Sequence, residues 1–159
     1  MAFALDAVDR NILSELQTDS SRSLDEIAKK VGASKTATWN RIRKLRENGV
    51  ILRQTAILDP EKLELEACFF VLVRTSEHDK TWQDRFLAVI RERPEVLEAH
   101  RLAGDIDYLL KVRVANAKAY DVFYQSLIKE VKLFNVTSLL SMEEIKSTTM
   151  LPLGQNPPA

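Results

Sequence analysis

The feature that most restricts the fold is a two-residue step, Gly32-Ala33, between two segments with helical periodicity. Before the step, apolar residues within 24–31 recur at three- and four-residue spacing. Ser23 and Glu26 form an S-x-x-E capping box, which predicts where this helix begins. Ser34 is placed to cap the helix that follows the step. Because two helices joined by so short a turn form a helix-turn-helix, the sequence predicts this motif.

A further helix and a β-rich segment flank this pair. Apolar residues within 8–16 repeat at helical spacing, which predicts a helix before the motif. Residues 50–59, VILRQTAILD, favour β structure and lead to Pro60, which predicts a linker boundary. We therefore expect a helix-turn-helix domain over residues 1–50 and a β-strand or linker over 51–64. A domain of about 60 residues has a marginal core, so we expect it to depend on a partner.

The remaining sequence alternates between strand-like and helix-like patterns. In chain order the segments are a strand at 66–75, a helix at 80–93, strands at 95–104 and 107–115, a helix at 118–131 and a strand at 135–147. The order β-α-β-β-α-β is that of a ferredoxin-like domain, in which helices cover one face of an antiparallel sheet. We expect this α+β domain over residues 65–159. Its other face needs cover, and a second copy of the chain is the simplest supplier, so we expect a homodimer.

Positive charge is concentrated in one segment, although the formal net charge of the whole chain is zero. Residues 20–54 carry nine Lys or Arg against three Asp or Glu, a net charge of +6, whereas 1–19 and 55–159 each carry −3. Local positive charge is typical of a site for a polyanion, although a solvated helix face accounts for it equally well.

The second helix of the motif, 34–47, divides into an inward and an outward side. Thr38, Ile42 and Leu45 form the inward stripe, and Trp39 is also expected to pack in the core. The residues placed outward or beside that face are Lys35, Thr36, Asn40, Arg41, Arg43, Lys44 and Arg46. Asn and Arg can pair with adenine and guanine, while Lys and Arg bind phosphates, so these residues predict a contact with double-stranded DNA. The alternative is a solvated helix in a small bundle.

Four segments carry a resemblance to a known family. They are LDAVDRNILSELQTD, LDEIAKKVGASKTATWNRIRKLRENGVI, TAILDPEKL and GDIDYLLKVRV. In this order they resemble the leucine-responsive and asparagine regulators of bacteria and archaea, the Lrp/AsnC family, over residues 5–153. WQDRF and EEIKSTTMLPL look most like a branch that contains regulators of cysteine detoxification and other amino-acid catabolism.

The resemblance implies a winged helix-turn-helix followed by a ferredoxin-like amino-acid-binding module. It implies dimers that form through the sheets of this module and often assemble into octamers, and transcription that responds to a small amino acid. It places the recognition helix on 34–47, which adds Ser34 to the DNA-contact candidates. Many relatives have proline where this chain has Lys35, so their operator sequences should not be transferred to it.

The resemblance also places an effector site between dimers. The matching residues are Leu102, Ala103, Gly104, Asp105, Asp107 and Tyr108 in a loop, and Leu139, Leu140 and Ser141 in the last strand. A glycine lets the backbone approach a ligand carboxylate, and an aspartate can accept hydrogen bonds from the ligand ammonium group. Taken without the family, GDID is more typical of a simple hairpin turn.

Other chemistry has little support in the sequence. Cys68 is the only cysteine, which excludes a disulfide within the chain and a thiolate cluster for zinc. There is no P-loop or dinucleotide-binding motif, and no apolar run approaches the roughly 18 residues that span a membrane. We therefore expect a cytoplasmic regulator of transcription in amino-acid metabolism, not an enzyme, with no metal and no cofactor apart from its effector. The alternative is an amino-acid-binding module that acts on a partner enzyme without binding DNA.

Overall fold

The computed structural model describes residues 3–76 and 79–154, so the outer ends of the expected domains 1–50 and 65–159 lie outside the described residues. The described residues form two compact units, each with its own apolar core. The helical unit comprises residues 3–57 together with 146–154, and the sheet unit lies within residues 58–145.

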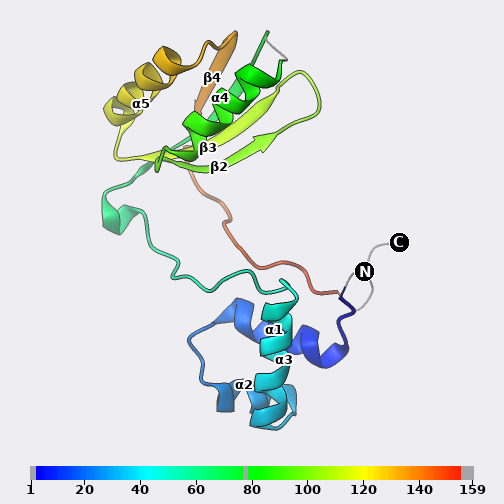
Figure 1. Ribbon diagram of the computed structural model, residues 1–159. Helices are drawn as coiled ribbons and strands as arrows, with labels where there is room; N and C mark the ends of the chain where they lie inside the picture. Colours follow the sequence, from blue (N-terminus) through cyan, green and yellow to red (C-terminus); the bar gives the residue numbers. More distant parts are fainter. Residues whose placement is uncertain (1–2, 77–78, 155–159) are drawn as a thin grey trace. The chain divides into compact units, whose positions relative to one another are not determined.

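The helical unit contains the three expected helices, α1 Ala7–Thr18, α2 Leu24–Val31 and α3 Lys35–Glu47 (Figure 1). Each begins after a residue whose side chain accepts a hydrogen bond from the backbone N–H three positions later: Asp6, Ser23 and Ser34. Gly32 ends α2 in the left-handed region, with φ of 68°, a conformation that favours glycine. The predicted helix-turn-helix is therefore confirmed, with the predicted caps at Ser23 and Ser34, and Asp6 caps α1 in the same way.

The core of the helical unit joins α1 to α3. Ile12 and Leu13 of α1 pack with Ile42 and Leu45 of α3. Leu153, from the C-terminal end of the chain, packs against this cluster. The C-terminal segment 146–154 therefore packs with the helical unit, although the sequence suggested grouping it with the sheet.

Residues 50–59 form no strand in the described structure of this single chain. Leu52 and Ile57 are 89% and 80% exposed, and the segment leads into a short 3-10 helix, Glu61–Leu63. A strand needs a neighbour that pairs with its backbone N–H and C=O groups, and the described part of the chain brings none beside this one. The expected strand or linker over 51–64 stays a prediction, and in the single chain residues 50–59 are not paired as a strand.

The sheet unit has the expected order of elements. Its strands and helices are β1 Ala67–Arg74, α4 Lys80–Arg91, β2 Val96–Arg101, β3 Tyr108–Val114, α5 Ala117–Glu130 and β4 Asn135–Leu140. The strands lie in the order β2-β3-β1-β4, and each paired neighbour is antiparallel. This arrangement confirms the ferredoxin-like fold. β4 is shorter than the expected strand at 135–147, because the chain leaves the sheet after Leu140.

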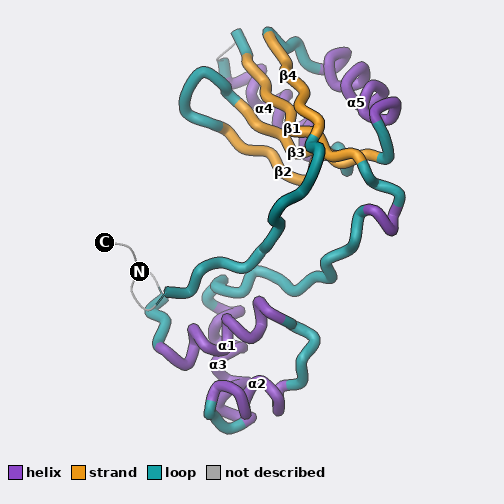
Figure 2. The backbone as a smooth tube through the Cα atoms, turned by 180° about the vertical axis from the view of Figure 1, so that it is seen from behind, coloured by secondary structure: helices purple, strands orange, loops and turns teal. Residues whose placement is uncertain are grey.

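The two helices of the sheet unit cover one face of the sheet, and Figure 2 shows the strands with α4 behind them. Alternate residues of β1 and β3, including the fully buried Val71 and Leu110, pack with Phe86 of α4 and Phe123 of α5. The alternation places a second set on the other face: Phe70, Leu72, Leu109 and Leu139. Neither α4 nor α5 covers this second set, and we call this surface the open sheet face.

Candidate nucleic-acid interface and ligand loop

The inward stripe of α3 is anchored as the spacing predicts. Thr38, Ile42 and Leu45 are between 0% and 8% exposed. The Thr38 hydroxyl donates to the carbonyl oxygen of Ser34 at 3.0 Å, so this buried polar group is satisfied. The Ser34 hydroxyl itself accepts the backbone N–H of Ala37 at 3.2 Å, which commits that side chain to the start of the helix.

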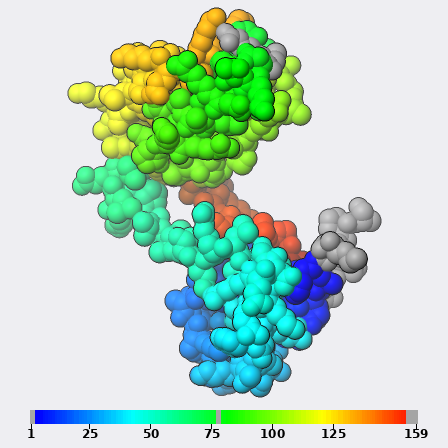
Figure 3. Space-filling view, in the orientation of Figure 1, coloured from blue at the N-terminus to red at the C-terminus, as the bar shows by residue number. Residues whose placement is uncertain are grey.

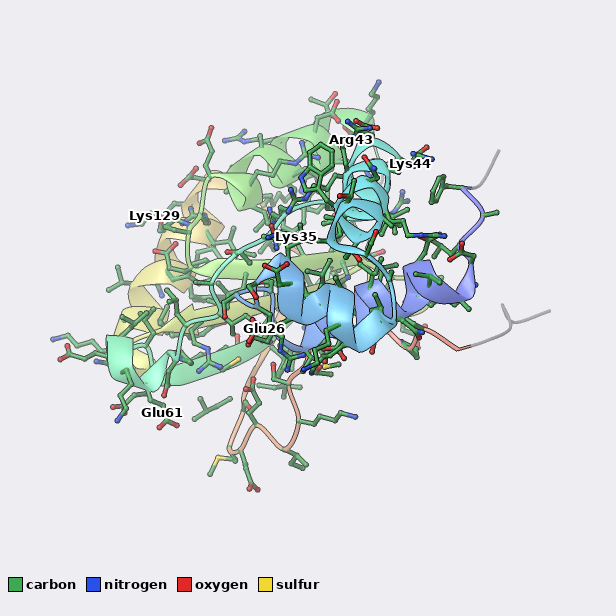
Figure 4. The ribbon with its side chains drawn as sticks, turned by 90° about the horizontal axis from the view of Figure 1, so that it is seen from below. Glu26, Lys35, Arg43, Lys44, Glu61 and Lys129 are labelled. Atoms are coloured by element: carbon green, nitrogen blue, oxygen red, sulfur yellow. The ribbon has the colours of Figure 1, made fainter. Side chains whose placement is uncertain are left out.

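The opposite side of α3 carries most of the residues expected to contact DNA. Lys35, Thr36, Arg43 and Lys44 are exposed, and Asn40 is half-buried. In the space-filling view, α3 (light blue to cyan) forms much of the visible surface of the helical unit (Figure 3). Figure 4 shows Arg43 and Lys44 projecting from the same part of α3, with Lys35 at the beginning of the helix. We call these five residues the outer face of α3.

Part of the positive charge on the outer face is paired. The ammonium group of Lys35 lies 2.7 Å from Oδ2 of Asp25 on α2, and Nε of Arg43 lies 3.6 Å from Oε1 of Glu47. Within the described residues Lys44 forms no ion pair. Exposed pairs of this kind contribute only about 0–1 kcal/mol, so a phosphate group can compete with them.

Arg41 takes a different position from Arg43. Its Nη1 donates to Oδ2 of Asp6 and to Oδ1 of Asp9, both at 2.7 Å, which joins α3 to the first turn of α1. The pKa of Asp6 is lowered, first by the hydrogen bond from the backbone N–H of Asp9 and then by Arg41. The structure therefore places this expected DNA-contact residue in an intramolecular bridge.

A second set of ion pairs joins α1 to α2 and the turn before it. The carboxylate of Glu15 accepts a hydrogen bond from Nζ of Lys30 at 2.9 Å, and it also pairs with Arg22. These cations lower the pKa of Glu15, and the hydrogen bond from Lys30 is the largest cause. Charged contacts thus connect α1 to both helices of the motif.

The expectation that Trp39 packs in the core is wrong. Its side chain is 49% exposed, and the guanidinium carbon of Arg43 lies 4.9 Å from the centre of its ring. The inward side of this turn is already occupied by Thr38 and Ile42. Helical spacing could have shown this, because Trp39 lies four residues before Arg43 and therefore on the same side of α3.

The expected ligand loop connects β2 to β3. Leu102, Ala103, Gly104 and Asp105 are all exposed, and the backbone N–H of Leu102 donates to the carbonyl oxygen of Asp107 at 2.8 Å. Gly104 has φ of 136°, a conformation that residues with a Cβ rarely adopt. This loop geometry is compatible with a hairpin connection and with a ligand that approaches the backbone.

Asp107 and Tyr108 are placed differently from the exposed part of the loop. Oδ2 of Asp107 accepts the backbone N–H of Thr75 at 2.8 Å, so this oxygen holds the end of β1. Tyr108 is 5% exposed, and its ring packs against Phe86 with centroids 4.7 Å apart. Asp105 is therefore the more exposed of the two aspartates.

The strand candidates lie at the other end of the sheet. Leu140 pairs with Phe69 near the start of β1, and the backbone N–H of Ser141 donates to Cys68. Tyr108 pairs with Val73, four residues farther along β1. At about 3.3 Å per residue, the two sets lie more than roughly 13 Å apart. A single chain does not bring them together, so a site that uses both needs two copies.

Leu139 and Leu140 are each 49% exposed, but they face opposite sides of the sheet. Leu139 lies beside Phe70 on the open sheet face, whereas Leu140 is on the side of the helices.

Within residues 3–76 and 79–154 no three His, Cys, Asp or Glu side chains are grouped to hold a metal ion. The same residues include no helix that is long and apolar enough to cross a membrane.

Two family models match the chain. The AsnC-type helix-turn-helix domain matches residues 5–46, and the Lrp/AsnC ligand binding domain matches residues 68–151. The glutamate uptake regulatory protein of Zymomonas mobilis is 47% identical over 151 residues, which are 95% of this chain and 92% of that protein. The DNA-binding transcriptional activator DecR of Escherichia coli is 44% identical over 150 residues, 94% of this chain and 99% of that protein.

Solved structures agree with the family models. An AsnC family transcriptional regulator from Agrobacterium tumefaciens has a TM-score of 0.91 and 47% identity, and the match covers 94% of this chain and 97% of that one. A transcriptional regulator from Neisseria meningitidis, solved as a complex with L-Met, has a TM-score of 0.90 and 30% identity over the same shares of the two chains.

Proposed function

Because the chain belongs to the Lrp/AsnC family of DNA-binding transcription regulators, we propose that α3 reads double-stranded DNA while the sheet unit binds a small amino acid. The observation that carries the proposal is the division of α3 into a buried stripe and a polar, cationic outer face. DecR is a DNA-binding transcriptional activator and the Agrobacterium relative is a transcriptional regulator, and we propose a regulator rather than an enzyme for this chain, acting in the cytoplasm.

In this proposal α3 lies in the major groove. Asn40 and Arg43 reach base edges, where amide and guanidinium groups make bidentate pairs with adenine and guanine. Lys35 and Lys44 neutralise phosphates. Ser34 and Thr36, near the start of α3, contact the sugar–phosphate backbone of the DNA. Arg41 contributes indirectly, because its bridge to α1 sets how α3 is presented.

The ligand is a small amino acid, as the L-Met complex of the Neisseria relative supports. The exposed backbone around Gly104 offers N–H groups to a carboxylate, and Asp105 offers an acceptor to an ammonium group. Leu140 and Ser141 of another copy complete the pocket, and Leu102 and Ala103 line its apolar part, whereas Leu139 faces the open sheet face. Asp107 and Tyr108 hold the loop in shape from inside the sheet unit.

Dimers form through the open sheet face, where Phe70 and Leu139 lie side by side and remain 36% and 49% exposed. Dimers then assemble further, up to octamers. A ligand that binds between dimers changes the populations of these assemblies only if it binds the assemblies with different affinities. Such a change would alter the spacing of the recognition helices along DNA.

The test is a double charge reversal, Arg43→Glu with Lys44→Glu, in the full-length protein. Its matched control is Lys118→Glu with Lys129→Glu on α5, which makes the same change in net charge in the other unit. Fluorescence anisotropy measures binding to a labelled duplex from upstream of the protein's own gene. We expect at least tenfold weaker binding for the α3 pair, with near wild-type binding for the control and the same sedimentation profile.

The same experiment addresses the alternative, a ligand-binding module that acts on a partner enzyme without DNA. That alternative requires that the wild type bind neither this duplex nor an unrelated one at low salt. It also requires that reversal of Arg43 and Lys44 change nothing. Either outcome contradicts the proposal.

A further inference from the structure

Trp39 occupies a position on the outer side of α3 that packing does not explain. Its side chain is 49% exposed, whereas Ile42 and Leu45 on the inward side are 8% and 0% exposed. A large aromatic side chain that is left half in water gains only part of the free energy of full burial. Within the described residues the Trp39 ring makes a cation–π contact with Arg43, one helical turn later.

Arg43 lies between two neighbours on the same side of the helix. The centre of its guanidinium group is 4.9 Å from the Trp39 ring, and its Nε is 3.6 Å from the carboxylate of Glu47. Trp39 precedes Arg43 by four residues and Glu47 follows it by four, so both lie on one ridge of α3. The two contacts limit the rotamers that this long side chain can adopt.

These contacts leave the functional end of the side chain available. The ion pair with Glu47 is recorded at Nε, 3.6 Å from the carboxylate, and within the described residues the guanidinium group of Arg43 donates no hydrogen bond. A guanidinium group reads guanine by donating two parallel hydrogen bonds to O6 and N7. A side chain that is already held in place loses less conformational freedom when these bonds form.

We propose that Trp39 is a positioning residue for base recognition, which holds Arg43 against its ring so that Arg43 reads one guanine in the major groove. The proposal rests on the proposed function of α3 and adds a determinant of specificity to it. Trp39 carries no charge, so its removal leaves the number of neutralised phosphates unchanged. It should therefore alter discrimination at one base pair and leave the salt dependence of binding as it is.

The experiment uses the full-length wild type and the variants Trp39→Ala, Trp39→Phe, Arg43→Ala and the double alanine variant. Each protein selects from a pool of random 20-base-pair duplexes, and the bound DNA is sequenced. Anisotropy then compares each protein on the enriched duplex and on duplexes in which each guanine in turn is replaced. Circular dichroism melting shows whether each variant is folded, and Trp39→Leu replaces Trp39→Ala if the latter is not.

We expect Arg43→Ala to reduce discrimination at one guanine by about 5- to 150-fold, the range for loss of a bidentate contact. Trp39→Ala should reduce it at the same guanine by about two- to fivefold, the range for an exposed cation–π contact. Trp39→Phe, which keeps a flat ring, should retain most of the discrimination. The double variant should match Arg43→Ala, because Trp39 acts through Arg43.

Other outcomes separate the possible failures. Equal loss of affinity by Trp39→Ala on every duplex indicates a general backbone contact and overturns the inference. Unchanged selection by Trp39→Ala, or an effect at a base that Arg43→Ala does not affect, also overturns it. If the wild type enriches no sequence, or if Arg43→Ala binds like the wild type, the proposed role of α3 itself fails.

Discussion

Nη1 of Arg41 lies 2.7 Å from Oδ1 of Asp9, which connects the middle of α3 to the first turn of α1. Asp9 is only 6% exposed, and the same nitrogen also donates to Asp6. The helix proposed to enter the DNA groove is therefore held by a charged bridge as well as by the apolar contacts of Ile42 and Leu45. Because the bridge lies away from the outer face, its loss should lower the stability of the helical unit without removing a direct contact to DNA.

Replacement of Arg41 by alanine should lower the free energy of unfolding by about 1–2 kcal/mol, because the nearly buried Asp9 loses a charge-assisted hydrogen bond. Urea denaturation of the full-length protein at pH 7, followed by helical circular dichroism, measures the change. Arg53→Ala is the control, since Arg53 is exposed in the linker. Equal stability of the two variants would contradict the structural role of Arg41.

Stability should fall as the pH is lowered through the acidic range. The pKa values of Asp6 and Glu15 lie below their ordinary values of 3.8 and 4.5, because hydrogen bonds and cations favour the carboxylates in the folded state. The unfolded chain then takes up protons first as the pH falls. The stabilisation of the folded state by these two carboxylates is complete above about pH 5. It is lost as the pH drops through their folded-state pKa values.

Urea titrations at pH 6, 5, 4 and 3 measure this dependence in the helical signal. Asp6→Asn removes one of the titrating groups and should make the dependence shallower than in the wild type. A helical unit whose stability is constant from pH 6 to pH 3 would refute the contribution of these carboxylates.

The C-terminal segment should open more often from α1 when Gln17 is replaced by alanine. The Gln17 amide accepts the backbone N–H of Leu151 at 2.6 Å and donates to its carbonyl oxygen at 3.2 Å. Loss of roughly 1 kcal/mol in hydrogen bonding predicts about fivefold faster amide hydrogen exchange at Leu151. Gln125→Ala on α5 is the matched control, and equal exchange in both variants would exclude the contact.

Substitution of Gly104 by valine should weaken ligand binding without weakening DNA binding. A side chain at φ of 136° is strained, at a cost of about 1–3 kcal/mol, so the loop must change shape. Isothermal titration with the twenty amino acids first identifies a ligand of the wild type, and affinity for it should then fall at least fivefold. Ala115→Val, just after the far end of β3, is the control. If no amino acid binds the wild type at millimolar concentration, the ligand proposal fails.

Introduction of a charge on the open sheet face should prevent dimerisation. Phe70→Glu places a carboxylate beside Leu139, where a second sheet would have to bury it without a partner. Sedimentation velocity should show a smaller species than the wild type. Val122→Glu makes the same kind of change on the exposed side of α5 and should leave the dimer intact. A Phe70→Glu protein that sediments like the wild type would rule out this interface.

Local signals account for the parts of the structure that were predicted correctly. The capping box at Ser23 and Glu26 and the left-handed Gly32 are properties of a few neighbouring residues, so the turn between α2 and α3 could be located from them alone. The order of strand-like and helix-like segments likewise predicted the β-α-β-β-α-β arrangement of the sheet unit.

The details that sequence reasoning missed depend on contacts between distant segments. Arg41 has the helical spacing of an outward residue, and only the position of α1 turns it into a bridge to Asp9. The contact of Gln17 with Leu151 joins residues 134 positions apart. The exposure of Trp39 runs against the general preference of tryptophan for burial, whereas its four-residue spacing to Arg43 indicates the outer side of α3.

The most direct test of the central claim asks whether α3 touches DNA. A photo-crosslinking amino acid replaces Thr36 on the outer face of α3, or Asp121 on α5 as the control, in the full-length protein. Each is irradiated with a labelled duplex from upstream of the protein's own gene. The account predicts a protein–DNA adduct from position 36 and none from position 121. Bound duplex that forms no adduct at position 36, or adducts of equal yield at both positions, would contradict it.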